Sequence, residues 1–370
     1  MQSMCMQQKQ AKKKKDKYVL FMILLFMWER LYYPSGATAN IYNIYVLVIA
    51  CTVFAVVGWQ RSPKVGLRIR ARELWVPLCL LFIGFHRWES SVEVFRNVLT
   101  FILIWICGKI TLGGMKTLHR ILIVLGAVYS IFQMIAMPGI RSVGFLIVSP
   151  TTFSYVLLIA VYALLFYDDF SFVDAILVSL AVGNVFLTQS RSTLLMVIIL
   201  CVMRFVFGRM KKIRLSFSTM KNVSLILTFI MAVFAFEMFD LDNLSIRENQ
   251  MASTFSRTEY IMRVVRVIQN EWGMLFLGKG GGFSITLNSS ISMLGRQIPL
   301  HQDILMFVCD YGIIGTLFIY YVFIAKLQWS IIALGVFLVG TFHNFFNAPT
   351  VVLLFVLTEN AMHTQKFYLS

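Results

Sequence analysis

Residues 143–167 read VGFLIVSPTTFSYVLLIAVYALLFY and contain no charged side chain. A helix needs about 20 consecutive apolar residues to cross the hydrocarbon core of a bilayer. This stretch therefore predicts a membrane-spanning helix. The following apolar runs, at 172–189 and 192–208, repeat the pattern with almost no loop between them.

The composition of the whole chain agrees with that prediction. Of its 370 residues, 59% are hydrophobic and 14% are charged, and the mean hydropathy is +0.78. Soluble domains contain about 45–50% apolar and about 25% charged residues, so a soluble enzyme and a disordered chain are excluded. We expect an all-α, polytopic membrane protein with about twelve spans. The apolar runs lie at 18–33, 39–58, 74–86, 92–107, 118–137, 143–167, 172–189, 192–208, 222–239, 303–325, 328–343 and 345–360.

The basic residues predict how these spans are oriented. The net charge is +16, and with the N-terminus inside, 22 of the 33 Lys and Arg residues fall on the inner side and five on short outer loops. This asymmetry follows the positive-inside rule and accounts for the basic charge without nucleic acid. The connection at 167–170 is an exception, because it falls inside without a positive charge. The predicted segments are a cytoplasmic tail (1–17), spans one to nine (18–239), an outer, periplasmic loop (240–302), spans ten to twelve (303–360) and a second cytoplasmic tail (361–370).

Neither a disulfide framework nor a metal site is predicted. Five of the six cysteines lie inside apolar runs, where Cys behaves as a small hydrophobe, and there is no CxxC pair. No HExxH, EF-hand or Walker pattern occurs, so we expect no cofactor and no metal.

Two arginines on the predicted outer face are the first candidates for a site. Thr188-Gln189-Ser190-Arg191-Ser192 joins two apolar runs, and a charge at membrane depth costs roughly 2.5–3.5 kcal/mol. In a predicted amphipathic helix at 254–270, Arg257 lies on the apolar stripe, whereas Arg263 and Arg266 lie on the opposite face. For both Arg191 and Arg257 the alternative is an arginine that snorkels to the membrane surface.

The segment before the tenth span holds two further candidates. Gly278-Lys279-Gly280-Gly281-Gly282-Phe283 is glycine-rich but is not a P-loop, and by itself indicates only a flexible turn. His301-Gln302-Asp303 opens a helix that carries Asp310 and Gly312, and a polar cap is the alternative to a base for His301. His343 lies at the outer end of span eleven and could line the same cavity or cap a helix.

Weaker candidates have ordinary structural explanations. Asp240-Leu241-Asp242 looks like the acidic pair of nucleotide-sugar enzymes. It is predicted to lie outside the membrane, where nucleotide sugars are absent, so a helix-ending turn explains it better. Arg87 and Arg96 flank a loop with Glu89 and Glu93, and surface ion pairs, which stabilise little, are expected there.

The order of these features resembles the O-antigen polymerase/ligase family of bacterial membrane glycosyltransferases. The likeness is best over about 175–325. The family's Ser-Arg motif falls on Ser190-Arg191, its loop arginine on Arg257, and its histidine on His301. Gln302 replaces the usual Asn, and Asp310-Tyr311-Gly312 stands where Glu-x-Gly is commoner. Both replacements keep the charge and the hydrogen-bonding type of the family's residues.

The resemblance implies a metal-independent glycosyl transfer at the outer face of the bacterial inner membrane. The donor glycan would be carried on polyprenyl diphosphate. Arg191 and Arg257 would bind the negative charge of the departing diphosphate through bidentate hydrogen bonds. His301 would act as the base for the acceptor hydroxyl. Ser190, Gly280, Gly282, Asp303, Asp310 and His343 would support the site. A flippase and a chain-length regulator are the protein partners that this implies, and nucleic acid is not among the partners.

We predict an oligosaccharide repeat-unit polymerase, with two alternatives. The ligase of the same family, which transfers glycan to lipid A-core, is the first. A transporter is the second, although transporters usually have internal repeats and a midplane site, whereas the polar candidates here gather at one face.

Overall fold

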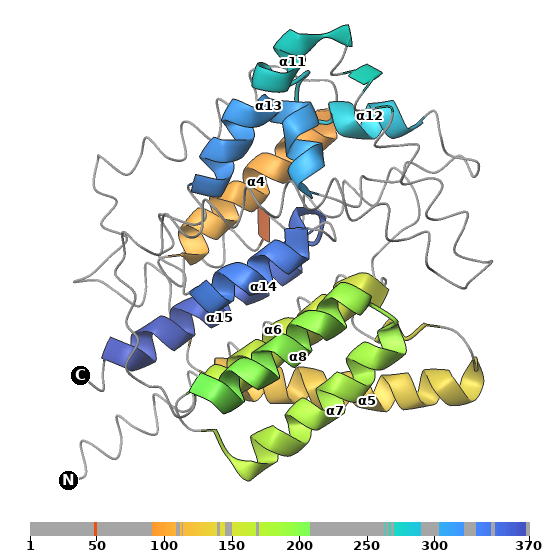
Figure 1. Cartoon of the computed structure of the whole chain (residues 1–370), viewed down its shortest axis with the longest axis vertical. Coiled ribbons are helices and arrows are strands. Elements are labelled where there is room, and N and C mark those ends of the chain that lie inside the picture. The colour runs from red at the N-terminus through yellow and green to blue at the C-terminus, as the bar shows by residue number, and fades with distance from the viewer. Residues whose placement is uncertain are drawn as a thin grey trace.

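The protein was analysed as a computed structural model, and it is all-helical over the part that the structure describes (Figure 1). The described residues are 48–49, 91–108, 112, 114–138, 141–144, 150–167, 170–207, 263, 266–267, 270–289, 303–321, 331–341 and 345–367. The predicted runs at 18–33, 39–58, 74–86 and 222–239 lie outside these ranges, apart from residues 48–49. The main helices are α4 (Ser91–Cys107), α5 (Met115–Ala136), α6 (Pro150–Phe166), α7 (Phe172–Thr188), α8 (Arg191–Phe207), α13 (Asp303–Tyr321), α14 (Ile331–Thr341) and α15 (Pro349–Phe367).

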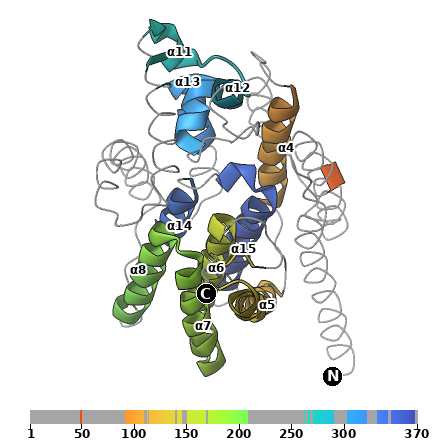
Figure 2. The ribbon, with the colours of Figure 1, turned by 90° about the vertical axis from the view of Figure 1, so that its right-hand side faces the viewer.

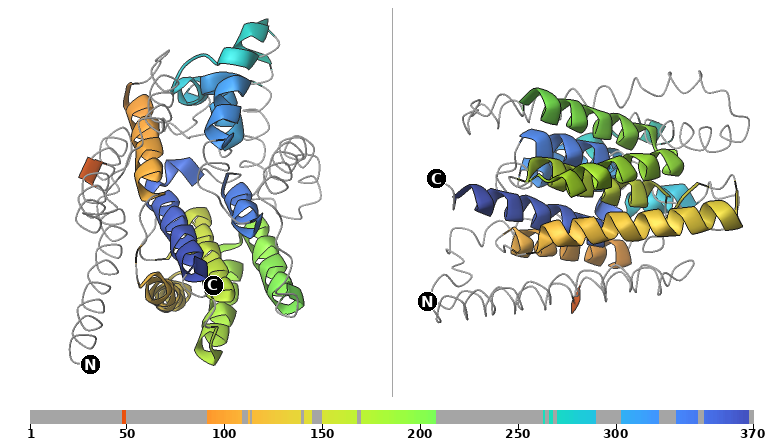
Figure 3. Two further views of the ribbon diagram at one scale, coloured as in Figure 1. Left: turned by 90° about the vertical axis from the view of Figure 1, so that its left-hand side faces the viewer. Right: turned by 90° about the horizontal axis from the view of Figure 1, so that it is seen from below.

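Helices α5 to α8 form a bundle in which α6 is central. Helices α6, α7 and α8 lie beside one another, α5 crosses them at an angle, and α15 packs next to α6 (Figure 3). Helix α6 packs against α5, α7, α8 and α15, and every residue from Phe153 to Leu165 is buried. A helix that is apolar all round buries all of its faces, which explains this central place. It begins at Pro150 because proline fits the first turn of a helix, where its missing N–H is not needed.

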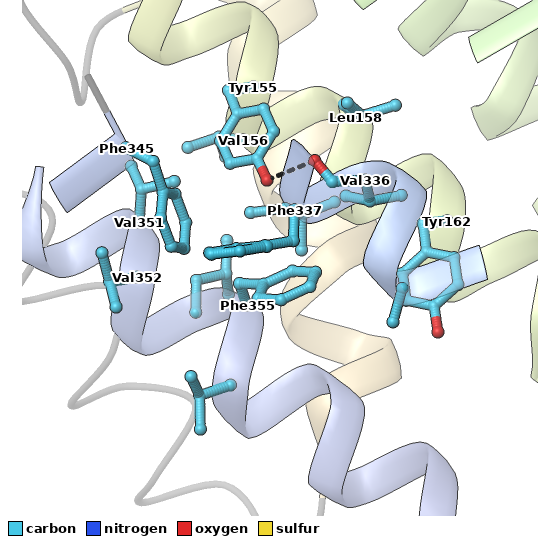
Figure 4. Packing of buried hydrophobic residues seen from close by; sticks show 14 of the residues in the cluster. Tyr155, Val156, Leu158, Tyr162, Val336, Phe337, Phe345, Val351, Val352 and Phe355 are labelled. Atoms are coloured by element: carbon cyan, nitrogen blue, oxygen red, sulfur yellow. Dashed lines mark hydrogen bonds between the residues drawn. The ribbon is translucent and has the colours of Figure 1, made fainter. Parts of the chain in front are cut away.

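Helices α14 and α15 meet α6 in an aromatic core (Figure 4). The short 3-10 helix η5 (Phe345–Asn347) joins them. The ring of Phe337 stacks with that of Phe355, at 6.3 Å between centroids, and meets Phe345 edge-on at 5.4 Å. The hydroxyl of Tyr155 donates to the carbonyl of Val336 at 2.6 Å, which satisfies this polar tip inside the aromatic core. This core fixes η5 beside the first turns of α6.

Three consecutive residues of α15 bind three different helices. The ring of His119 on α5 lies 2.9 Å from the Thr358 hydroxyl, which itself donates to the Leu354 carbonyl. The Tyr162 hydroxyl of α6 donates to Glu359 at 2.5 Å, and the Asn360 amide donates to the carbonyl of Cys107 at the end of α4. We call Thr358, Glu359 and Asn360 the polar seam. Since the Thr358 proton is already used, the His119 ring must donate through Nε2.

Helix α13, which falls within the span predicted over 303–325, is bent. Gly312 has φ 68° and ψ 178° and divides α13 into two arms, seen in Figure 1 as separate directions of one ribbon. Phe307 of the first arm packs on Phe346, and Tyr320 of the second arm packs on Phe337. Two short helices, α11 (Trp272–Leu277) and α12 (Phe283–Ser289), lie at the bend (Figure 2). The predicted long loop therefore contains helices that pack on α13.

The described part does not confirm twelve spans. Two of its helices are long and apolar enough to cross a membrane, namely α5 and 303–320 of α13. Five shorter apolar helices accompany them. The bundle nevertheless leaves large apolar side chains exposed on α5, α7 and α8, among them Phe132, Ile135, Phe172, Phe186, Leu195 and Ile198. Exposed apolar area that continues over neighbouring helices marks a surface that contacts something other than water.

The predicted exception to the positive-inside rule has a structural explanation. Asp174 begins α7 directly after the 167–170 connection, and its buried carboxylate binds Lys116 at 2.9 Å and Arg120 at 2.8 Å. It also completes a capping box with Ser171, which starts the helix. Helix α5 therefore supplies to this end of α7 the positive charge that the connection itself lacks.

Cys107, Cys201 and Cys309 are free thiols, which agrees with the predicted absence of disulfides at these three positions.

Candidate functional site

The Ser-Arg motif forms the tight junction between α7 and α8. Gln189 ends α7 in the left-handed conformation (φ 55°), and α8 begins two residues later at Arg191. The buried Ser190 hydroxyl lies 2.9 Å from that of Thr193, which lies 3.1 Å from that of Ser154 on α6. Ser190 therefore anchors the junction to α6, and its hydroxyl faces other side chains rather than an open surface.

Arg191 points away from this anchored core. Its side chain is exposed, and it forms no hydrogen bond or ion pair with any residue of the described ranges. The motif thus combines a fixed backbone with an available guanidinium, which can accept an anion bidentately. At the other end of α8, Arg204 lies over the ring of Phe170 at 5.4 Å from its centroid.

Arg141 lies at the same end of the bundle, and its only signal in the sequence was its place in a predicted outer loop. Its Nε donates to the carbonyl of Thr188 at 2.8 Å, at the last turn of α7. The Gln133 side chain holds the adjoining backbone on both sides, donating to the Arg141 carbonyl and accepting from the Val143 amide. Arginine at this position neutralises the negative end of α7.

The glycine turn and the bend of α13 form one packed unit. The amides of Lys279 and Gly280 donate to the carbonyls of Cys309 and Asp310, each at 2.9 Å. The Asp310 carboxylate in turn accepts from the amides of Gly282 at 3.1 Å and Ser284 at 2.8 Å. Gly280, Gly282 and Asp310 are all buried, so the turn is anchored on α13 rather than flexible as predicted.

Two glycines make this close packing feasible. A Cβ on Gly278, whose φ is +74°, would clash with the backbone of Asp310, and one on Gly312 would clash with the backbone of Phe276. Both positions therefore exclude any side chain, by sterics and by the positive φ. Gly280, Gly282 and Asp310, to which the resemblance assigned a supporting role, hold the glycine turn against α13.

Asp303 lies at the start of α13 and is fully buried. Its Oδ2 accepts from the amide of Phe346 in η5 at 3.0 Å, and Oδ1 forms no hydrogen bond within the described residues. The ring of Phe345, the residue before Phe346, meets that of Tyr155 on α6 edge-on, at 5.5 Å between centroids. Through Tyr155, which adjoins the Ser154 that anchors Ser190, the start of α13 and the Ser-Arg junction lie at the same end of α6.

The expected surface position of Arg96 is wrong. Arg96 is only 4% exposed, and the next residue, Asn97, donates to the hydroxyl of Tyr311 at 2.9 Å. Asn97 and Phe101 of α4 contact Tyr311 and Phe307 of the first arm of α13, and no local sequence pattern shows such long-range contacts.

Three of the predicted site residues, Arg257, His301 and His343, lie outside the described residues. Of the two arginines expected on the polar face of the loop helix, Arg266 is exposed and Arg263 is half-buried. Among the described residues, no group of three or more His, Cys, Asp or Glu side chains could hold a metal ion.

Comparison of the chain with protein-family models, curated proteins and solved structures finds no match.

Proposed function

We propose that the chain is an integral membrane glycosyltransferase that polymerises oligosaccharide repeat units carried on polyprenyl diphosphate. The observation that carries this proposal is the α7–α8 junction. An exposed Arg191 follows a buried Ser190, at the end of a helical hairpin whose outer surface is apolar. An apolar helix surface can bind a lipid tail, and a cation at the end of that surface can bind the negatively charged head group.

The proposed reaction transfers the growing glycan to the terminal sugar of the next lipid-linked unit. The bond between the anomeric carbon and the diphosphate oxygen breaks, and a bond to the acceptor hydroxyl oxygen forms. Arg191, with Arg257, would bind the charge that develops on the leaving diphosphate, and His301 would take the hydroxyl proton. The products are a lengthened lipid-linked glycan and a free polyprenyl diphosphate.

The proposed location is the inner membrane of a bacterium, with the site on the outer face and both termini in the cytoplasm. The inner end of the bundle in this orientation carries Lys116 and Arg120, whereas Arg141 and Arg191 lie at the outer end. The polypeptide partners would be the flippase that delivers the substrate and a regulator of chain length.

One observation favours a transporter as the second candidate. The bend at Gly312 divides α13 into two arms, and broken helices are typical of transporter binding sites. However, the bend is filled by α11 and by the glycine turn, whose backbones contact it directly. We therefore place the enzyme first.

Reconstitution tests the two candidates. Purified protein in lipid nanodiscs, supplied only with polyprenyl-diphosphate-linked repeat units, should produce a ladder of polymer on a gel. Arg191→Ala should abolish the ladder, and Arg191→Lys should restore part of it, because lysine lacks the bidentate fork. Arg204→Ala is the matched control, since it removes an arginine from the opposite end of the same helix.

The outcomes separate the alternatives. A product that forms only when lipid A-core is added would assign the ligase. Absence of any product from well-folded wild type, together with uptake of the glycan into sealed vesicles, would assign the transporter and overturn the enzyme.

A further inference from the structure

We propose that the end of α11 and the second arm of α13 are embedded together in the outer leaflet of the bilayer and hold the glycine turn at the level of the lipid head groups. This inference rests on the proposed function, which places the chain in a membrane with this segment on the outer side. The sequence predicted residues 240–302 as an outer loop and predicted no part of that loop inside the bilayer.

The first support is a group of large apolar side chains exposed around the bend of α13. Phe276 and Leu277 end α11, and Ile314 and Leu317 follow the bend, with exposed fractions between 53% and 61%. We call these four residues the apolar patch. Met274, two residues before Phe276, is buried. Helix α11 therefore turns one side to the protein interior and another side outward.

The second support is that direct backbone contact joins the two parts of the apolar patch. A Cβ on Gly312 would clash with the carbonyl of Phe276 and with the amide nitrogen of Leu277, so the 276–277 peptide lies on the bend itself. In two perpendicular views α11 lies on the side of α13 that faces away from α5 to α8 (Figures 1 and 2). The apolar patch is thus separate from the exposed apolar surface of that bundle.

The third support is the charge beside the apolar patch. Lys279, which follows α11 after one residue, pairs with the exposed Glu271 at the other end of the helix. Arg266 and Asn270, which precede the helix, are exposed as well. A short segment with large apolar residues on one side and charged residues next to them is typical of a helix at a membrane interface.

The size of the apolar patch favours lipid over a second copy of the chain. Four side chains exposed by 53–61% offer on the order of 400 Å². A stable dimer buries about 800 Å² on each partner, whereas contact with lipid has no such minimum. Residues 303–320 of α13, which include Ile314 and Leu317, are also long and apolar enough to cross a membrane. Lipid beside that helix would meet the end of α11 too.

Embedding the apolar patch would fix the height of the glycine turn. Gly278 follows Leu277 directly, and the amides of Lys279 and Gly280 are bonded to carbonyls of α13. The turn therefore cannot move away from the bilayer without α11 and the bend. The head-group level is also where the diphosphate of a lipid-linked glycan lies, so the turn would border the space that the proposed substrate occupies.

The first experiment identifies what covers the apolar patch and does not require activity. p-Benzoylphenylalanine, whose ketone bonds to a nearby C–H group on illumination, replaces one residue at a time in protein reconstituted in phosphatidylglycerol and phosphatidylethanolamine vesicles. The positions are Phe276 and Ile314 in the apolar patch, Ile198 on α8 and Asn270 as the polar control, all of them exposed. We expect the patch variants to gain the mass of one phospholipid with a yield within about twofold of the Ile198 variant, and the Asn270 variant to gain far less.

The outcomes of this experiment separate the inference from the proposed function. Lipid adducts at Ile198 but none at Phe276 or Ile314 would overturn the embedding and leave the membrane location intact. A cross-linked dimer from the patch variants, or a protein adduct after illumination of whole cells, would assign the apolar patch to a second copy or to a protein partner instead. Absence of lipid adducts at Ile198 as well, from folded protein, would overturn the membrane location and the proposed function with it.

The second experiment measures the cost of a charge in the apolar patch. If Phe276 lies in lipid, Phe276→Asp should lower the melting temperature in vesicles by at least about 2 °C, because a carboxylate is costly there. Asn270→Asp is the matched control, since it places the same side chain six residues earlier at a polar exposed position, and it should leave the melting temperature unchanged. Equal melting temperatures of the two variants would contradict the embedding.

Discussion

The carboxylate Oδ1 of Asp310 accepts a hydrogen bond of 2.8 Å from the backbone amide of Ser284, across 26 residues of sequence. With its other oxygen on the amide of Gly282, Asp310 binds the first turn of α12 to the bend of α13. An aspartate that accepts from amides at a helix start also compensates the positive end of the helix.

Replacing Asp310 should therefore detach α12. Hydrogen bonds to a charged group contribute about 1.5–3 kcal/mol each, so Asp310→Ala should lower the free energy of unfolding by about 3 kcal/mol or more. Asp310→Asn should cost less, because it keeps one acceptor oxygen. Unfolding in a mild detergent measures both, and an effect no larger than that of Glu271→Ala would contradict this assignment.

Gly312 should not tolerate alanine. The new Cβ would meet the carbonyl of Phe276, and the backbone is held at φ 68°. We expect Gly312→Ala to reduce the yield of folded protein strongly. Gly183→Ala is the matched control on α7, where a Cβ meets nothing within 4 Å. It should stabilise the protein by about 0.5–1 kcal/mol, so equal behaviour of the two variants would refute the close packing at the bend.

Replacing Glu359 should destabilise the protein, because its carboxylate accepts the hydrogen bond of the buried Tyr162 hydroxyl. Glu359→Ala leaves the buried Tyr162 hydroxyl without this acceptor, at a cost of about 1–3 kcal/mol in unfolding free energy. Glu359→Gln keeps an oxygen at that place and should cost less. The double variant Glu359→Ala with Tyr162→Phe should recover part of the loss, and a fully additive loss would argue against the bond.

His301 should behave as a base rather than as a cap. Glutamine keeps size and hydrogen bonding but cannot titrate, so His301→Gln should remove polymerisation from a folded protein. General bases contribute about 10²- to 10⁴-fold, enough to reduce long polymer to one or a few repeats. The assay uses purified protein with a chelator present; wild-type activity of the Gln variant would reject the base, and chelator sensitivity of wild type would indicate a metal.

The proposed topology can be tested without substrate. A reporter that is active only outside the membrane should work when fused within 243–295 and fail when fused within 210–219. The opposite pattern would place the glycine turn and Arg191 on the cytoplasmic side and would remove the proposed site.

The bundle helices were predictable because their signal is local. The runs at 92–107, 118–137, 172–189 and 192–208 match α4, α5, α7 and α8 to within a few residues. A continuous apolar stretch shows a helix without its neighbours being known. The start of α6 at Pro150 rather than 143 also depends on local chemistry, since Gly144 takes a positive φ before it.

The site was less predictable because its contacts join distant segments. The aspartates at 303 and 310 suggested a role in the site because they are acidic. Both carboxylates accept hydrogen bonds from backbone amides, and the positions of these amides depend on the fold. Arg96 was placed at the surface for the same reason: its acidic neighbours in sequence suggested a surface pair, whereas the fold buries it. The bend at Gly312 carried a glycine signal, but glycine within an apolar helix does not by itself distinguish a bend from close packing.

The polar seam of α15 has a consequence for biogenesis. The ribosome makes α4, α5 and α6 long before α15. These helices contribute the His119 ring, the Tyr162 hydroxyl and the Cys107 carbonyl, whose partners on α15 lie more than 190 residues further along the chain. Until Thr358, Glu359 and Asn360 have been made, the early helices lack these three contacts. A chain that stalled or was cleaved before residue 358 would therefore lack the contacts that join α4, α5 and α6 to α15.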